Sequence, residues 1–184
     1  MQVRSRPSAW RPIRPEAPSG PVTVTRAAIT IALAALLTGP AWGQSSLPDP
    51  SRTPGALNPE VTQETIDRTI CMPGWTEGVR PPREYTSAVK RAQLREWRYA
   101  DRRLSHYEED HLVPLGLGGA LYDARNLWPE PRFSADGWDA DRKDELEYVL
   151  NHLVCARRLS LRAAQQAIAT DWIAAYRRFV APAP

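Results

Sequence analysis

The order of short segments over residues 107–155 is the feature that most restricts the fold. Residues 110–115 begin with an Asp-His pair and are otherwise mostly apolar, and the glycine-rich sequence 116–119 follows them. This pattern predicts a short strand that ends in a turn. Residues 126–128 predict a second short strand, and 139–155 predict an amphipathic helix with apolar side chains every three or four residues. We therefore expect a mostly helical, small α+β domain around a ββα hairpin-helix unit.

Other segments complete this expected domain, which we place at residues 59–184. Helices are predicted over 59–70, over 87–99 and from 160 to about 179, each after a residue that can cap a helix. The last of them has a possible kink near Thr170-Asp171. Residues 44–58 are rich in Ser, Pro and Gly and predict a flexible linker.

The first 43 residues have the pattern of a secretory signal peptide. A basic lead-in precedes eleven apolar or small residues at 27–37, and Ala41-Trp42-Gly43 offers small residues before a cleavage site near Gly43. The apolar run is short for a membrane span, so we expect no stable membrane anchor. The alternative is a buried core helix. The signal predicts a periplasmic or secreted protein.

Removal of this segment changes the meaning of the net charge. The whole chain carries +3, but five Arg and one Glu lie in the first 43 residues, so the remainder carries −1. Evidence for an anionic partner must therefore come from local clusters. Residues 80–103 contain eight basic and three acidic residues, which suits a phosphate backbone and equally suits a solvated helix face with local ion pairs.

The two cysteines, Cys71 and Cys155, exclude a four-cysteine zinc site and a CxxC redox motif. Outside the cytoplasm two distant cysteines are more often paired than free. We expect a Cys71–Cys155 disulfide, and the alternative is two buried thiols.

The central motif resembles the HNH nuclease family, also called ββα-metal or His-Me finger endonucleases. The resemblance rests on the Asp-His pair, the Gly-Gly loop, an Asn 15 residues after the His, and the acidic helix that follows. It is closest to a group of small exported bacterial HNH proteins. The stretches that carry this likeness are Cys71-Met72-Pro73-Gly74, Glu109-Asp110-His111-Leu112, Asn126-Leu127-Trp128-Pro129, Lys143-Asp144-Glu145-Leu146-Glu147 and Val154-Cys155.

The resemblance implies a role for each residue of the motif. His111 is the expected general base, since imidazole titrates near neutral pH. Asp110 is the expected ligand of a divalent cation, most plausibly Mg²⁺ with Mn²⁺ as a second choice. Neighbours on a strand point to opposite faces, so these two side chains converge only if the strand ends or bends there. Asn126 is expected to orient the base, and the alternative is a simple turn residue.

This sequence departs from the family pattern at the metal ligand of the helix, where no His is present. We expect Asp141 to replace it, with Asp144 as the next candidate. The alternative is that these acids only complement the positive end of the helix dipole. Arg125, Arg142 and Lys143 are the expected phosphate contacts.

The function implied is a monomeric, metal-dependent endonuclease that cleaves DNA or RNA with low sequence specificity. Two other functions stay open. One is a non-catalytic exported binding module on the same scaffold, which the substituted ligand and the net charge of −1 favour. The other is a metal-dependent hydrolase of another ester, since fold analogy does not define the substrate.

Overall fold

The computed structural model describes residues 45–181, which belong to one compact unit, Pro40–Pro184. The predicted signal peptide lies outside the described residues. The unit contains α1 (Trp75–Val79), α2 (Arg83–Glu96), β1 (Tyr107–His111), β2 (Leu127–Pro131), α3 (Ala140–Cys155) and α4 (Leu161–Phe179). Short 3₁₀ turns also occur at Ile66–Arg68, Leu104–His106, Leu115–Leu117 and Ala124–Asn126. The expected α+β class is confirmed. In this part of the chain, no helix has both the length and the apolar character needed to cross a membrane.

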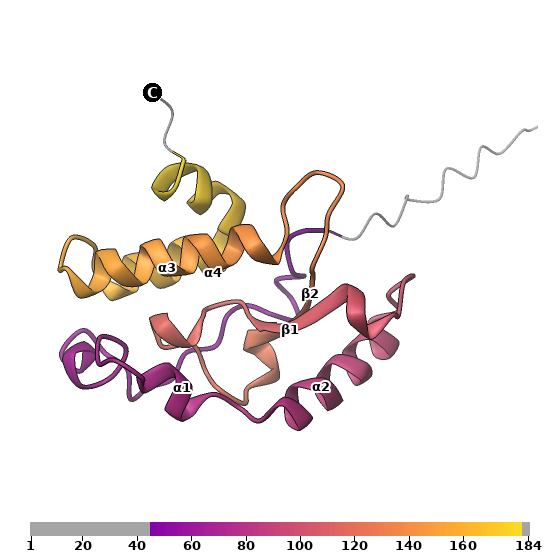
Figure 1. Ribbon diagram of the computed structural model, residues 1–184, viewed down its shortest axis with the longest axis horizontal. Helices are drawn as coiled ribbons and strands as arrows, with labels where there is room; N and C mark the ends of the chain where they lie inside the picture. The colour runs from indigo at the N-terminus through magenta and orange to yellow at the C-terminus, as the bar shows by residue number, and fades with distance from the viewer. Residues whose placement is uncertain (1–44, 182–184) are drawn as a thin grey trace, which may run out of the picture. The chain divides into compact units, whose positions relative to one another are not determined.

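The two strands form an antiparallel hairpin between α2 on one side and the α3–α4 pair on the other (Figure 1). Asp110 lies opposite Trp128, and His111 lies opposite Leu127. The first strand begins earlier than expected and ends at His111, while the second continues to Pro131. The Asp-His pair therefore lies at the end of β1, where the chain turns into the glycine-rich loop.

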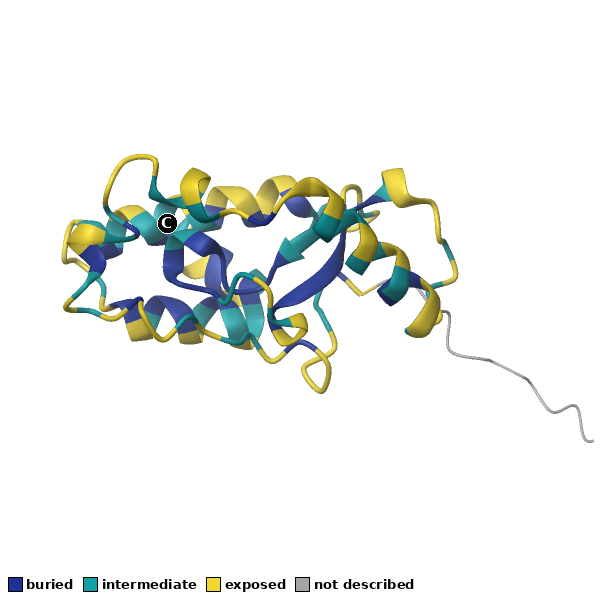
Figure 2. Ribbon diagram, turned by 90° about the horizontal axis from the view of Figure 1, so that it is seen from below, coloured by how far each residue is buried: buried dark blue, intermediate teal, exposed yellow. Residues whose placement is uncertain are grey.

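Helices α3 and α4 enclose most of the hydrophobic core. Leu146, Leu150 and Val154 of α3 are fully buried, as are Ile168 and Trp172 of α4. Burying a side chain of this size contributes about 2 kcal/mol each. Figure 2 shows buried residues on the inner sides of the helices and exposed residues on the outer sides. The predicted helix over 139–155 is confirmed.

The last predicted helix is also confirmed, together with its cap and its kink. The Ser160 hydroxyl accepts a hydrogen bond from the Ala163 amide. The backbone leaves helical geometry at Asp171, with φ −162° and ψ 95°. The Asp171 carboxylate then accepts from the Ala174 amide at 2.9 Å, which caps the second half of α4.

The predicted helix over 59–70 is wrong, because only the 3₁₀ turn Ile66–Arg68 forms there. Threonine hydroxyls in this stretch bind nearby backbone groups. Thr65 Oγ1 accepts from the Thr62 amide and donates to the Glu60 carbonyl, both at 2.8 Å. Such local bonds give the backbone an alternative to a helix.

The prediction of a flexible linker is also wrong for residues 45–58, which pack against the rest of the unit. Trp172 Nε1 donates to the Ser46 carbonyl at 2.8 Å, and Thr53 is fully buried. The Gly55 amide donates to the Arg125 carbonyl at 2.9 Å. Long-range partners hold this segment, although its composition is typical of a loop.

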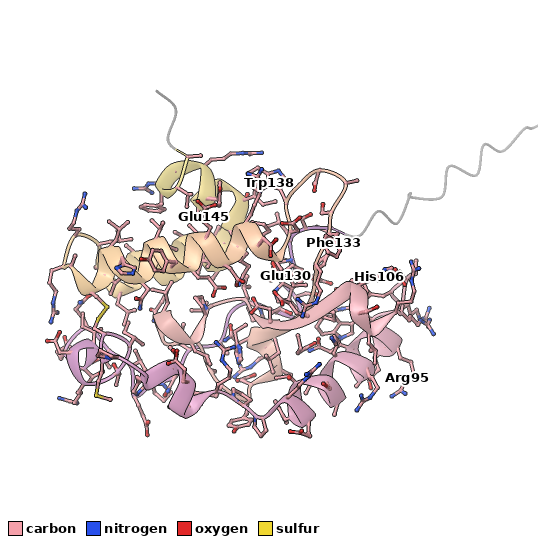
Figure 3. The ribbon with its side chains drawn as sticks, in the orientation of Figure 1. Arg95, His106, Glu130, Phe133, Trp138 and Glu145 are labelled. Carbon is pink, nitrogen blue, oxygen red and sulfur yellow. A yellow bond between two sulfur atoms is a disulfide. The ribbon has the colours of Figure 1, made fainter. Side chains whose placement is uncertain are left out.

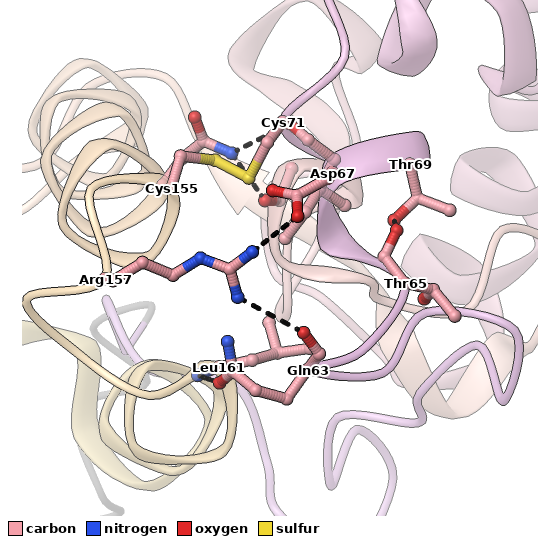
Figure 4. Close-up of a disulfide and its surroundings, with 11 residues drawn as sticks. Gln63, Thr65, Asp67, Thr69, Cys71, Cys155, Arg157 and Leu161 are labelled. Carbon is pink, nitrogen blue, oxygen red and sulfur yellow. Dashed lines mark hydrogen bonds and ion pairs between the residues drawn. A yellow bond between two sulfur atoms is a disulfide. The ribbon is translucent and has the colours of Figure 1, made fainter.

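The Cys71–Cys155 disulfide is present, as expected. It joins the segment before α1 to the last residue of α3, with a Cα–Cα distance of 5.5 Å. Figure 4 shows a second link beside it, where Arg157 lies 2.5 Å from the Asp67 carboxylate. The disulfide thus connects two parts of the unit that are 84 residues apart.

Candidate active site

The Asp-His pair directs its two side chains to opposite sides of the hairpin. Asp110 Oδ2 lies 2.5 Å from Lys143 Nζ on the α3 side. His111 Nε2 lies 3.0 Å from the carbonyl oxygen of Leu121, in the loop between the strands. A carbonyl oxygen only accepts, so Nε2 carries the hydrogen and Nδ1 of a neutral ring holds the free lone pair. Burial lowers the pKa of His111, which favours this neutral form at pH 7.

Asn126 is fully buried and holds the loop that leads to Leu121, whose carbonyl binds the His111 ring. Its Oδ1 accepts from the Val113 amide at 2.9 Å, and its Nδ2 donates to the Val113 carbonyl at 2.9 Å and to the Ala120 carbonyl at 3.2 Å. These bonds close the glycine-rich loop immediately before Leu121. Asn126 therefore has the geometry of an orienting residue that acts on His111 through the backbone.

A glycine is required where this loop passes Asn126. A Cβ atom added to Gly119 would lie 1.7 Å from the Val113 carbonyl oxygen and 2.6 Å from Asn126 Nδ2. Both distances are far below van der Waals contact. The Gly-Gly sequence in the predicted loop thus has a steric reason, which is the close approach of the backbone to the Asn126 amide.

Lys143 does not lie on the surface, so its expected contact with phosphate is wrong. The residue is fully buried and shares one stripe of α3 with Leu146 and Leu150. Its ammonium donates to Asp110 Oδ2, to the His111 carbonyl at 3.0 Å and to Glu147 Oε1. The spacing of Lys143 from Leu146 and Leu150 places it on the side of α3 that faces the core. The expected phosphate contact considered only its positive charge and not this spacing.

Two further carboxyl groups near Lys143 were not expected at the site. Glu147 is four residues after Lys143, a spacing that permits an ion pair on a helix and was visible in the sequence. Glu130 is 1% exposed, and neither of its carboxyl oxygens has a hydrogen-bond partner within residues 45–181. Burial raises the pKa of both groups, and Lys143 opposes that rise. Glu130 belongs to β2, and Figure 3 shows it between the strands and α3.

The residues expected to bind a metal are not brought together as a set. Asp110 is already paired with Lys143, and Asp141 is exposed at the start of α3. Asp144 is also exposed, and partial burial and then the charge of Asp110 raise its pKa. Among the described side chains, no three or more His, Cys, Asp or Glu residues form a group that could hold a metal ion. Carboxylates suit a hard cation, but this arrangement does not fit a resident metal.

A cavity of about 550 Å³ opens beside these carboxylates, between residues 70–80 and α3. Its wall carries one arginine and three carboxylates, which are Arg80, Glu77, Asp144 and Glu147. The positive charge of Arg80 acts on Asp144 and, after burial and other groups, also helps to lower the pKa of His111. Arg80 was expected only as part of a basic cluster, and the structure places it at the cavity.

The other expected phosphate contacts are exposed. Arg125 has a 70% exposed side chain and pairs with Asp123 at 2.6 Å. Arg142 stacks over Trp138 at 5.2 Å and Tyr176 at 5.6 Å, so its guanidinium is held beside the start of α3. Arginines of the basic stretch 80–103 are likewise exposed, and Figure 3 shows Arg95 on the outer side of α2.

Comparison with known proteins found no matching family model, no similar curated protein and no similar solved structure.

Proposed function

We propose that the protein is an exported endonuclease that hydrolyses phosphodiester bonds in DNA or RNA. The observation that carries this proposal is the anchored imidazole of His111 at the end of β1. Its Nε2 is held by Leu121, in a loop that Asn126 fixes, and its Nδ1 is left as a proton acceptor. The order of strand, loop, strand and helix that resembles HNH nucleases supports the same function. The disulfide supports export, since disulfides persist in oxidising compartments.

The proposed chemistry starts from the neutral imidazole of His111, on which the positive charge of Arg80 acts. Nδ1 of His111 accepts a proton from a water molecule while the water oxygen bonds to phosphorus. The bond from phosphorus to the 3′ oxygen then breaks, and that oxygen takes a proton from solvent. Arg80 supplies positive charge for the developing phosphorane oxygens, and the exposed arginines contact neighbouring phosphates without reading bases. No step is assigned to a metal ion, because the carboxylates present do not fit one.

Plasmid DNA and an RNA transcript provide the test, each incubated with purified protein, His111→Ala and His106→Ala. His106 is a matched control, because it lies just before β1, at the opposite end of that strand from His111, where its ring pairs with Asp101 at 2.6 Å. We expect cleavage by the wild type and by His106→Ala, and a loss of at least about 100-fold in His111→Ala. Because His111 must be neutral to act, the rate should fall as the solution becomes acidic. Equal cleavage by all three proteins would contradict the catalytic role of His111.

A non-catalytic binding module is the second candidate, and the Asp110–Lys143 pair favours it. A carboxylate already neutralised by a buried ammonium is less available for chemistry. This function predicts salt-dependent binding of a labelled polyanion, measured by fluorescence anisotropy, with no cleavage under any cation condition. Cleavage that depends on His111 contradicts it.

A further inference from the structure

We infer that the ammonium group of Lys143 takes the place of the divalent cation that the HNH resemblance implies. The junction between the β-hairpin and α3 is then held by a cation that belongs to the chain itself. This inference goes beyond the proposed function, because it concerns what binds the carboxylates and holds whether or not the protein cleaves nucleic acid.

The contacts of Lys143 are those of a fully satisfied cation. An ammonium has three N–H donors, and each has an acceptor here: Asp110 Oδ2 at 2.5 Å, the His111 carbonyl at 3.0 Å and Glu147 Oε1. Two acceptors come from the end of β1 and one from α3. Lys143 therefore joins the same two elements that a metal ion at this place would join.

The charges around Lys143 explain why the ammonium is stable without water. An isolated ammonium in the protein interior is costly, and opposite charges must compensate for it. Burial by itself lowers the pKa of Lys143, but Asp110, Glu147 and Glu130 together raise it well above its ordinary value. The carboxyl oxygens of Glu130, which have no hydrogen-bond partner within residues 45–181, face this same group.

A divalent cation would have to compete with Lys143 for the same oxygens. Asp110 and Glu147 each hold the ammonium with one oxygen and have side chains about one-fifth exposed. A metal beside them would meet a fixed positive charge at hydrogen-bond distance from its own ligands, and that repulsion disfavours binding. Removing the ammonium leaves several carboxyl groups around the space it filled, which is the donor set that a hard cation prefers.

Binding of Mn²⁺ tests the inference, measured by titration calorimetry and by the paramagnetic resonance signal of free Mn²⁺. The proteins compared are the wild type, Lys143→Ala, Asp110→Asn and Arg158→Ala, an exposed control in the turn between α3 and α4. We expect no Asp110-dependent site in the wild type or Arg158→Ala, and no change in their thermal midpoints with EDTA or Mn²⁺. Lys143→Ala should bind Mn²⁺ at least about tenfold more tightly than the wild type and regain thermal stability in its presence.

Two results overturn the inference. One is a stoichiometric Mn²⁺ site in the wild type that Asp110→Asn removes. The other is a folded Lys143→Ala protein with no gain in Mn²⁺ affinity. If Lys143→Ala does not fold, the wild-type titration decides alone. Cleavage is not measured, so a failure here is separate from a failure of the proposed nuclease function.

Discussion

Glu109 directly precedes the Asp-His pair on β1, and its charge acts on Tyr85 and Lys90 of α2. Both of its carboxyl oxygens are inaccessible to solvent and have no hydrogen-bond partner in the described part of the chain. Burial raises the pKa of Glu109 to about 9, and the nearby charge of Asp110 adds to the rise, while Lys90 opposes it. The folded protein therefore keeps a proton on this group at neutral pH.

This raised pKa makes stability depend on pH. The pKa of an ordinary Glu is 4.5, and that of Glu109 in the folded protein is about 9. At pH values between these two, the folded state holds a proton that the unfolded state has lost. The stability that the protonated Glu109 contributes is therefore fully present below pH 4.5, and it is lost as the pH rises from 4.5 to about 9. Each pKa unit corresponds to about 1.4 kcal/mol, so the whole shift sets an upper limit of about 6 kcal/mol. Because relaxation and water entry reduce such penalties, we expect about 2–4 kcal/mol.

Urea unfolding of the wild type and Glu109→Gln, at about pH 5 and at about pH 9, measures this contribution. A glutamine is neutral at both pH values, so the variant should gain about 2–4 kcal/mol relative to the wild type on going from the lower to the higher pH. Glu96→Gln, an exposed position on α2, is the control and should show no such change. Other buried acids such as Glu130 act equally in both proteins and cancel. An equal difference at the two pH values would refute the reasoning.

Three further predictions concern the loop and the disulfide, each measured as the free energy of unfolding in urea. Gly119→Ala should destabilise by about 3 kcal/mol or more, because the added methyl group overlaps a backbone carbonyl. Gly78→Ala, which has open space within α1, should not destabilise the protein. Unchanged stability of the first variant would contradict the close approach described above. Asn126→Ala leaves buried backbone groups unpaired and should cost about 3 kcal/mol. A cost no larger than that of an exposed Asn→Ala change would argue against the loop-holding role. Replacing both Cys71 and Cys155 with serine should cost about 4–5 kcal/mol, from the closure of a long loop, and the same loss should follow reduction of the wild type.

Local patterns explain which elements were predictable. Apolar residues at helical spacing predict the helix over 139–155, and Ser160 caps the next helix with its own hydroxyl. These signals need only neighbouring residues. The Cys71–Cys155 pairing was also accessible, since the described chain has only two cysteines to pair. The helix over 59–70 failed because threonine side chains compete for the same backbone groups, and helical pattern alone does not weigh that competition.

The sequence by itself determined the order of hairpin and helix, the identities of the Asp-His pair and the Ser160 cap, because each depends on short-range spacing. Only the tertiary structure decided that Asp110 faces Lys143, that Glu130 is buried beside them and that residues 45–58 pack against α4. The physical reason is that an ionic group acquires its role from the charges and the burial around it. Those neighbours come from strands and helices that are distant in the chain, and only folding brings them within reach of one another.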